Sequence, residues 1–175
     1  METEAQLIHA CLQNNRNAQR KLYQAYAGRM LVVCNRYAQN DAEAEDILQD
    51  SFIKIFQNLD KFRLESTLGA WIKRIVVNTA INQIRSQQHF QNMEDVQNYG
   101  NELVDNQGSI EGIHFQELIT MVQKLPKGCQ AVFNLFAIEG YKHTEIAEML
   151  NITEGTSKSQ YARARGILQS QLIKI

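Results

Sequence analysis

Apolar residues recur along most of this chain at intervals of three and four, the spacing of one face of an α-helix. The pattern predicts a short helix over about residues 4–14 and a longer one over about 16–39. A third helix is expected from a cap at Asp41 through the stretch DAEAEDILQDSFIKIFQNLDKF, and a fourth from a cap at Ser66 to about residue 88. The two-residue alternation of β-strands is missing and there is a single proline, so the sequence predicts an all-α protein.

The second half of the chain predicts another group of helices. IEGIHFQELITMVQKL and KGCQAVFNLFAIEG have helical patterns, and the second is expected to stop at Gly140. A short helix, KHTEIAEML, is followed by a tight turn at Asn151 and Ile152, and Thr153 caps a last, longer helix. This succession predicts a helix-turn-helix.

A polar and acidic stretch, QNMEDVQNYGNELVDNQGS, separates the two halves and has no sustained period. It predicts a flexible acidic linker over residues 91–109 that joins two small helical domains, at 1–90 and 110–175.

Charge is unevenly distributed, although the formal net charge of the whole chain is only −1. Residues 61–90 carry five cations and one carboxylate, and residues 151–175 carry four cations and one carboxylate. Residues 41–60 carry six carboxylates and one cation. Such segregation indicates that different segments have different partners.

Several classes of function find no support in the residues. No stretch approaches the roughly 20 apolar residues of a membrane helix, and the first residues are acidic where a signal peptide is basic, so we expect a cytoplasmic protein. Cys11, Cys34 and Cys129 lie far apart within helical patterns and predict buried, reduced thiols. Neither metal-ligand spacing nor a phosphate-binding or nucleophile motif is found. We expect no metal, no cofactor, no small-molecule substrate and no enzymatic activity.

On a helical wheel the last helix has two unlike faces. The face expected to be buried carries Ser157, Tyr161, Ala164 and Leu168. The opposite face has small residues at its centre and cations at its edges: Gly155, Ser159 and Gly166, flanked by Lys158, Ala162, Arg163 and Arg165. A helix in the DNA major groove needs short side chains that reach base edges and cations that meet phosphates. An ordinary solvated face is the alternative, but the preceding helix and turn favour DNA.

Two earlier helices also present polar faces. The fourth groups one aromatic, two cations and two amides opposite an apolar side made of Val76, Val77, Ala80 and Ile84: Trp71, Arg74, Asn78, Asn82 and Arg85. Such a set suits single-stranded or duplex DNA, unless Trp71 is a core residue. The third helix presents Asp46, Gln49, Asp50 and Ile53 away from its apolar stripe, which carries Ile47, Leu48, Phe52, Ile55, Phe56 and Leu59. An exposed isoleucine among acids favours a protein partner with a basic surface, and acids that serve solubility alone are the alternative.

Three stretches together resemble the two conserved domains of bacterial RNA polymerase sigma factors of the extracytoplasmic-function class, over about residues 10–172: DAEAEDILQDSFIKIFQNLDKF, STLGAWIKRIVVNTAINQIR and LPKGCQAVFNLFAIEGYKHTEIAEMLNITEGTSKSQYARARGIL. The resemblance implies a transcription initiation factor that binds core RNA polymerase and directs it to specific promoters. Residues 1–90 would be sigma region 2 and residues 110–175 sigma region 4. The implied partners are the clamp helices of the largest polymerase subunit, the flap of the second subunit, promoter DNA and an anti-sigma factor.

The resemblance also implies roles for individual residues. Core polymerase would be bound by Asp46, Gln49, Asp50, Phe52 and Ile53. The minus-ten element would be recognised and melted by the loop 62–67 and the fourth helix, through Phe62, Arg63, Trp71, Arg74, Asn78, Asn82 and Arg85. The minus-thirty-five element would be read as duplex by Thr156, Lys158, Ser159, Ala162, Arg163 and Arg165. Ser157 stands where the family often has valine, and Gln160 replaces a frequent arginine.

Two other interpretations start from the same helices. A stand-alone helix-turn-helix regulator would use its first helices to dimerise or bind a ligand. A helical adaptor would bind proteins only and have no role on nucleic acid.

Overall fold

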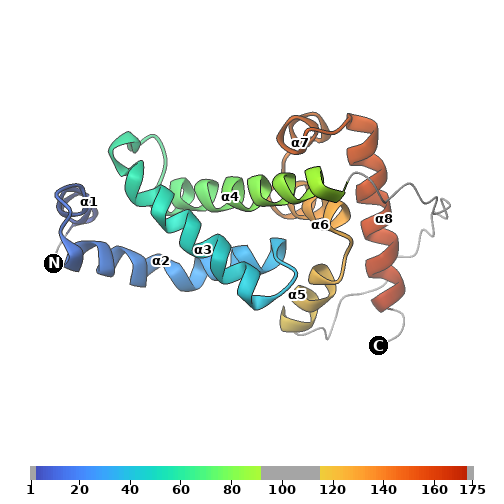
Figure 1. Cartoon of the computed structure of the whole chain (residues 1–175), viewed down its shortest axis with the longest axis horizontal. Coiled ribbons are helices and arrows are strands. Elements are labelled where there is room, and N and C mark those ends of the chain that lie inside the picture. Colours follow the sequence, from blue (N-terminus) through green and yellow to red (C-terminus); the bar gives the residue numbers. More distant parts are fainter. Residues whose placement is uncertain (1–2, 92–114, 173–175) are drawn as a thin grey trace. The chain divides into compact units, whose positions relative to one another are not determined.

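The computed structural model describes residues 3–91 and 115–172, and every regular element within these ranges is a helix (Figure 1). The expected all-α fold is thereby confirmed. The chain packs into two compact units, Met1–Ala80 and Ile81–Ile175, so the division falls inside the helix α4 (Leu68–Gln91). Apart from Gln91, the expected linker at 91–109 lies outside the described residues, and the domain boundaries at 90 and 110 stay predictions.

The first unit contains α1 (Glu4–Leu12), α2 (Arg16–Tyr37), α3 (Asp41–Gln57), the short 3-10 helix η1 (Leu59–Lys61) and the first part of α4. Side-chain caps start the first two helices. The Thr3 hydroxyl accepts from the backbone N–H of Gln6 at 3.3 Å, and the Gln6 side chain accepts from the Thr3 N–H at 2.9 Å. Asn15 caps α2 by accepting from the N–H of Ala18 at 3.1 Å. These bonds satisfy donors that the first turn of a helix leaves without a backbone partner.

Two of the predicted caps are wrong by one residue. The cap of α3 is Asn40, whose Oδ1 accepts from the Glu43 N–H at 2.9 Å, and Asp41 is already helical. The cap of α4 is Thr67, whose hydroxyl accepts from the Ala70 N–H at 3.3 Å. In both places two neighbouring residues have side chains that can cap a helix, and backbone conformation decides between them.

The apolar stripe of α3 forms the centre of the first unit. Ile47, Phe52 and Ile55 are buried there, and Leu59 of η1 is buried as well. The ring of Tyr23 on α2 lies 4.6 Å from the ring of Phe52, centroid to centroid, and so joins the two helices. The core includes the apolar side of α4, at Leu68, Ile72, Val76, Val77 and Ala80.

The second unit contains the rest of α4, α5 (Phe115–Gln123), α6 (Lys127–Phe133), a five-residue π-helical segment η2 (Asn134–Ile138), α7 (His143–Leu150) and α8 (Glu154–Leu172). Its core cluster is made of Met121, Val122, Leu125, Cys129, Ala164 and Leu168. The predicted stop at Gly140 is confirmed: this residue has φ +80°, which glycine adopts at little cost.

Cys11, Cys34 and Cys129 are buried free thiols, as predicted. Among the described residues, none of the helices combines the length and the apolar character needed to span a bilayer.

Candidate nucleic-acid interface

The predicted helix-turn-helix is confirmed in α7, the turn and α8. Asn151 ends α7 in the left-handed conformation, with φ 55° and ψ 48°, which asparagine tolerates better than most residues. The N–H of Ile152 donates to the carbonyl of Ala147 at 3.0 Å and closes the turn. The Thr153 hydroxyl then accepts from the Thr156 N–H at 3.0 Å, which caps α8 as predicted.

The two faces of α8 divide as the helical wheel predicts. Ser157, Ala164 and Leu168 are buried, and Tyr161 is half-buried. On the opposite face the following residues are exposed: Gly155, Lys158, Ser159, Ala162, Arg163, Arg165 and Gly166. Thr156 is partly exposed at the edge of this surface. A helix with such a face can approach the edges of base pairs closely while its cations lie beside the phosphates.

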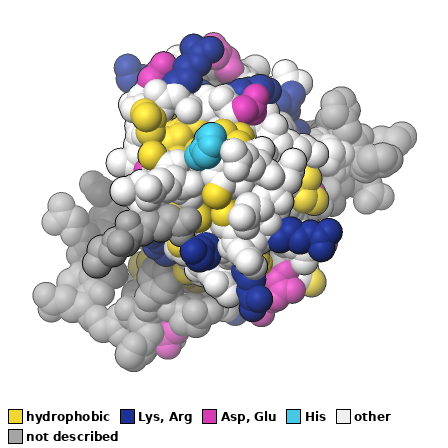
Figure 2. All heavy atoms as spheres, turned by 90° about the vertical axis from the view of Figure 1, so that its left-hand side faces the viewer, with side chains coloured by type: hydrophobic (Ala, Val, Ile, Leu, Met, Phe, Trp, Pro, Cys, Tyr) yellow, Lys and Arg dark blue, Asp and Glu magenta, His cyan; other side chains and the backbone are white. Residues whose placement is uncertain are grey.

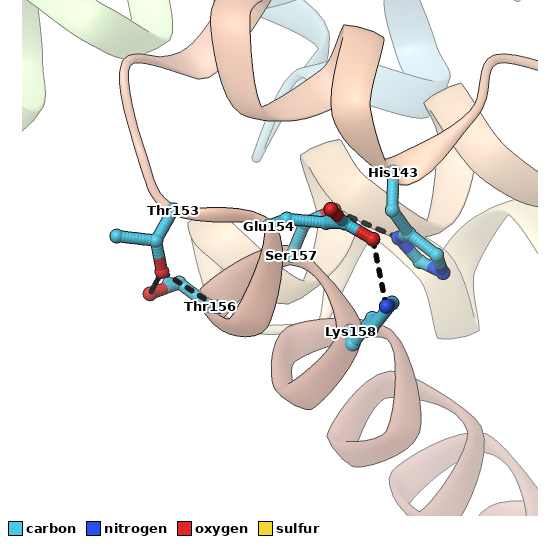
Figure 3. A network of polar contacts seen from close by, with 6 residues as sticks. All are labelled: His143, Thr153, Glu154, Thr156, Ser157 and Lys158. Carbon is cyan, nitrogen blue, oxygen red and sulfur yellow. Dashed lines mark hydrogen bonds and ion pairs between the residues drawn. The ribbon is translucent and has the colours of Figure 1, made fainter.

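One of the cations on α8 already has a carboxylate partner. The Nζ of Lys158 lies 2.7 Å from Glu154, one helical turn earlier (Figure 3). This hydrogen bond and the positive charge of Lys158 lower the pKa of the Glu154 carboxyl. Both side chains are exposed, so the pair is accessible to a ligand that competes for Lys158.

The polar face of α4 lies where the sequence predicts it. Arg74, Asn78, Asn82 and Arg85 are exposed along the helix. Trp71 is half-buried, so it is not a fully enclosed core residue. Its ring lies 5.5 Å from the ring of Phe62, centroid to centroid, with the planes at 51°.

The loop before α4 contains a residue that the sequence reasoning missed. Leu64 is 71% exposed, and its φ of 58° places it in a conformation that costs a branched, non-glycine residue energy. Arg63, which was predicted, is exposed beside it. The available signal was a leucine between charged residues in the loop KFRLES.

The polar face of α3 is also accessible. Asp46, Gln49 and Asp50 are exposed, and Ile53 is 55% exposed. Phe52, which belongs to the same predicted set, is only 3% exposed and packs on Tyr23. It can therefore support this surface from below, whereas the other four residues can meet a partner directly.

Apolar side chains reach the surface elsewhere in the first unit. Figure 2 faces the α1 end of the molecule and shows apolar groups among Lys, Arg, Asp and Glu side chains. Among the described residues of this unit, the large exposed hydrophobic ones are Leu12, Tyr23, Val32, Ile53 and Leu64. Ile53 and Leu64 are the two that belong to the surfaces described above.

Comparison with known proteins identifies the family to which the chain belongs. Family models described as Sigma-70 region 2 and Sigma-70, region 4 match residues 22–90 and 115–168, respectively. The chain is 30% identical over 158 residues to the ECF RNA polymerase sigma factor SigW of Bacillus subtilis, with 84% of each chain covered. It is 28% identical over 181 residues to the ECF RNA polymerase sigma-E factor of Haemophilus influenzae, covering 97% of this chain and 95% of the relative.

A solved structure has a similar fold. It is the sigma factor RpoE of Bartonella quintana, in complex with the anti-sigma factor NepR, with TM-score 0.52 and 22% identity over 89% of this chain and 96% of that chain. The matches to regions 2 and 4 together define a sigma factor. The chain belongs to the extracytoplasmic-function class of bacterial RNA polymerase sigma factors, which bind core RNA polymerase and direct it to specific promoters. A stand-alone helix-turn-helix regulator is not favoured, because the first half of the chain matches region 2.

Proposed function

We propose that the exposed face of α8 reads the minus-thirty-five element as duplex DNA in the major groove. The observation that carries this proposal is the absence of large side chains from the centre of that face, at Gly155, Ser159 and Gly166, in the described α8. Arg163 and Arg165 are exposed beside it and supply charge for the phosphates or a base edge. Thr156, Lys158 and Ala162 complete the contact surface.

The polar face of α4 and the loop before it recognise the minus-ten element and hold its separated strand. Trp71 and Phe62 offer aromatic surface for an unstacked base, and Arg63, Arg74 and Arg85 offer charge to the backbone. Asn78 and Asn82 can pair with base edges. Leu64 adds an exposed apolar side chain that can pack on a displaced base.

The polar face of α3 binds the clamp helices of the largest polymerase subunit. Asp46 and Asp50 supply negative charge, Gln49 adds hydrogen bonds, and Ile53 supplies an apolar contact on an otherwise polar surface. Phe52 holds α3 on α2 from the other side.

Residues 1–90 and 110–175 act as sigma regions 2 and 4, and the second region also meets the flap of the second polymerase subunit. An anti-sigma factor is the further partner that we propose, as the similar RpoE was crystallised with one. The chain itself performs no catalysis, and its near-neutral net charge of −1 favours weak binding to DNA in the absence of polymerase.

Substitution of Arg163 by alanine tests the role of α8. With core polymerase present, Arg163→Ala is expected to weaken promoter binding by about 1–3 kcal/mol if the guanidinium pairs with a base, and only at promoters that carry that base. Equal weakening at every sequence would identify a phosphate contact. No weakening at any sequence would contradict the proposed reading surface at this residue.

A further inference from the structure

The buried face of α8 carries a hydroxyl where a purely apolar contact would suffice. Ser157 is 0% exposed, and its Oγ lies 2.9 Å from the Nδ1 of His143, with which it shares a hydrogen bond (Figure 3). A buried hydroxyl without a partner costs free energy, so this bond is a requirement of the packing.

The ring of His143 is held on two sides. It stacks on Phe136 of η2, with centroids 4.3 Å apart and planes at 12°. Its centroid is 5.9 Å from that of Tyr161 on α8, with the rings edge to face, and Tyr161 is itself 4.6 Å from Phe136. The imidazole therefore has little freedom to turn, and its Nδ1 points in a fixed direction.

The two bonded residues lie at the start of their helices. His143 is the first residue of α7, and Ser157 lies in the first turn and a half of α8. Residues of this part of a recognition helix contact base edges in helix-turn-helix proteins. On α8 the neighbours of Ser157 are Thr156 and Lys158, and Ser159 follows, all three in the proposed reading surface.

A hydrogen bond is directional, whereas apolar packing is not. Apolar contacts alone would hold α8 against α7 but would tolerate a small rotation of α8 about its own axis. Such a rotation would move Ser159 and Ala162 relative to the bases. A bond from Ser157 to a ring that packs on Phe136 and Tyr161 restrains it.

We propose that the His143–Ser157 hydrogen bond is a positioning contact that fixes the rotation of α8, and with it the base contacts at the upstream promoter element. The inference rests on the proposed role of α8. His143 and Ser157 act through the reading surface, and neither touches DNA.

A double-mutant cycle in the full chain bound to core polymerase tests this. The variants are His143→Phe, which keeps an aromatic ring but removes Nδ1, Ser157→Ala, and the two combined. Run-off transcription is measured from a promoter selected by the wild-type holoenzyme and from the same promoter with its upstream element replaced. The ratio of the two yields is the discrimination, and thermal unfolding of each variant is measured alongside.

Each single variant is expected to lose about threefold to tenfold in discrimination, the factor that one net hydrogen bond is worth. The double variant should lose no more than the worse single variant, because both changes remove the same bond. His143→Asn, which keeps a polar atom near the position of Nδ1, should recover part of the discrimination. The matched control Ser170→Ala removes an exposed hydroxyl from the same helix and should change nothing.

Changes in unfolding temperature with unchanged discrimination in all three variants would overturn the inference, since they would show a role in folding alone. If one single variant does not fold, the double variant His143→Phe with Ser157→Ala, which leaves neither bonding partner unpaired, can still be compared with the wild type. Loss of discrimination in Arg163→Ala, with full discrimination in the cycle, would overturn this inference and leave the proposed function standing. A wild-type holoenzyme that ignores the upstream element would overturn both.

Discussion

Glu154 and Lys158 form an ion pair of 2.7 Å across one turn of α8, at the edge of the surface that we propose for the upstream promoter element. When Lys158 contacts a DNA phosphate, it must therefore either break its ion pair with Glu154 or interact with both groups at once. Removing the carboxylate frees this cation and also removes a negative charge that repels DNA. Glu154→Gln is expected to strengthen promoter binding by the holoenzyme and to weaken its sequence preference.

The salt dependence of binding measures this effect. Because one more cation becomes available to DNA, the slope of log K against log salt should become steeper by about one unit. Glu148→Gln makes the same charge change at an exposed position on α7 and serves as the control. Equal effects of the two substitutions would show that net charge alone, and not the pair, controls binding.

Gly166 lies inside α8, and a Cβ built there meets no atom within 4 Å apart from its chain neighbours and the nearby backbone of its own helix. Gly166→Ala should therefore stabilise the helix by about 0.5–1 kcal/mol, measured by denaturant unfolding. The same methyl group would stand on the surface that approaches DNA, so we expect promoter binding to weaken while stability rises. If Gly166→Ala increased both stability and promoter binding, the missing side chain at this position would not be needed for close approach of α8 to DNA.

Trp71 is half-buried beside Phe62, so its ring has one part that packs against the protein and another that is accessible to a DNA base. Substitutions can distinguish stacking on a base from packing within the fold. Trp71→Ala is expected to impair promoter opening, seen as lower permanganate reactivity of thymines in the minus-ten element, because each stacked base contributes about 1–3 kcal/mol. Trp71→Phe should retain most of the opening. Normal opening by a destabilised Trp71→Ala protein would identify a packing residue.

Burial in the core of the first unit raises the pKa of the Cys34 thiol from 9.0 to about 12. Between pH 9 and about pH 12 the folded protein therefore keeps the thiol proton, whereas the unfolded chain loses it. The stabilising contribution is full below pH 9, and the free energy of unfolding falls as the pH rises toward 12. Cys34→Ala should make this decline shallower than in the wild type, in parallel titrations of stability. Parallel curves for the two proteins would contradict the raised pKa.

The helices and the faces of α8 and α4 could be predicted because they depend on periodicity, which the sequence displays directly. The burial of Ser157 and the exposure of Arg165 follow from their angles on one helix. The cap of α8 at Thr153 could be predicted, but the caps of α3 and α4 only to within a residue, since neighbours such as Asn40 and Asp41 have side chains of similar capping ability.

Features that depend on contacts between elements could not be predicted in this way. The hydrogen bond between His143 and Ser157 joins residues whose separation in space is set by the turn, and the ring of Phe136 enters from a third element. The left-handed backbone conformation of Leu64 could not be predicted either, because leucine rarely adopts it. The π-helical segment Asn134–Ile138 is likewise absent from the pattern of apolar positions.

The protein is proposed to bind polymerase and DNA through separate surfaces, and the most direct test is run-off transcription by purified core polymerase with this chain. Wild-type protein is expected to join the core enzyme and give specific transcripts. Asp50→Arg should abolish both, with an unchanged circular dichroism spectrum, while the same charge reversal at Asp60, an exposed residue of η1 that is not part of the proposed α3 surface, should retain both. Failure of the wild-type chain to bind core polymerase, or full activity of Asp50→Arg, would contradict the account.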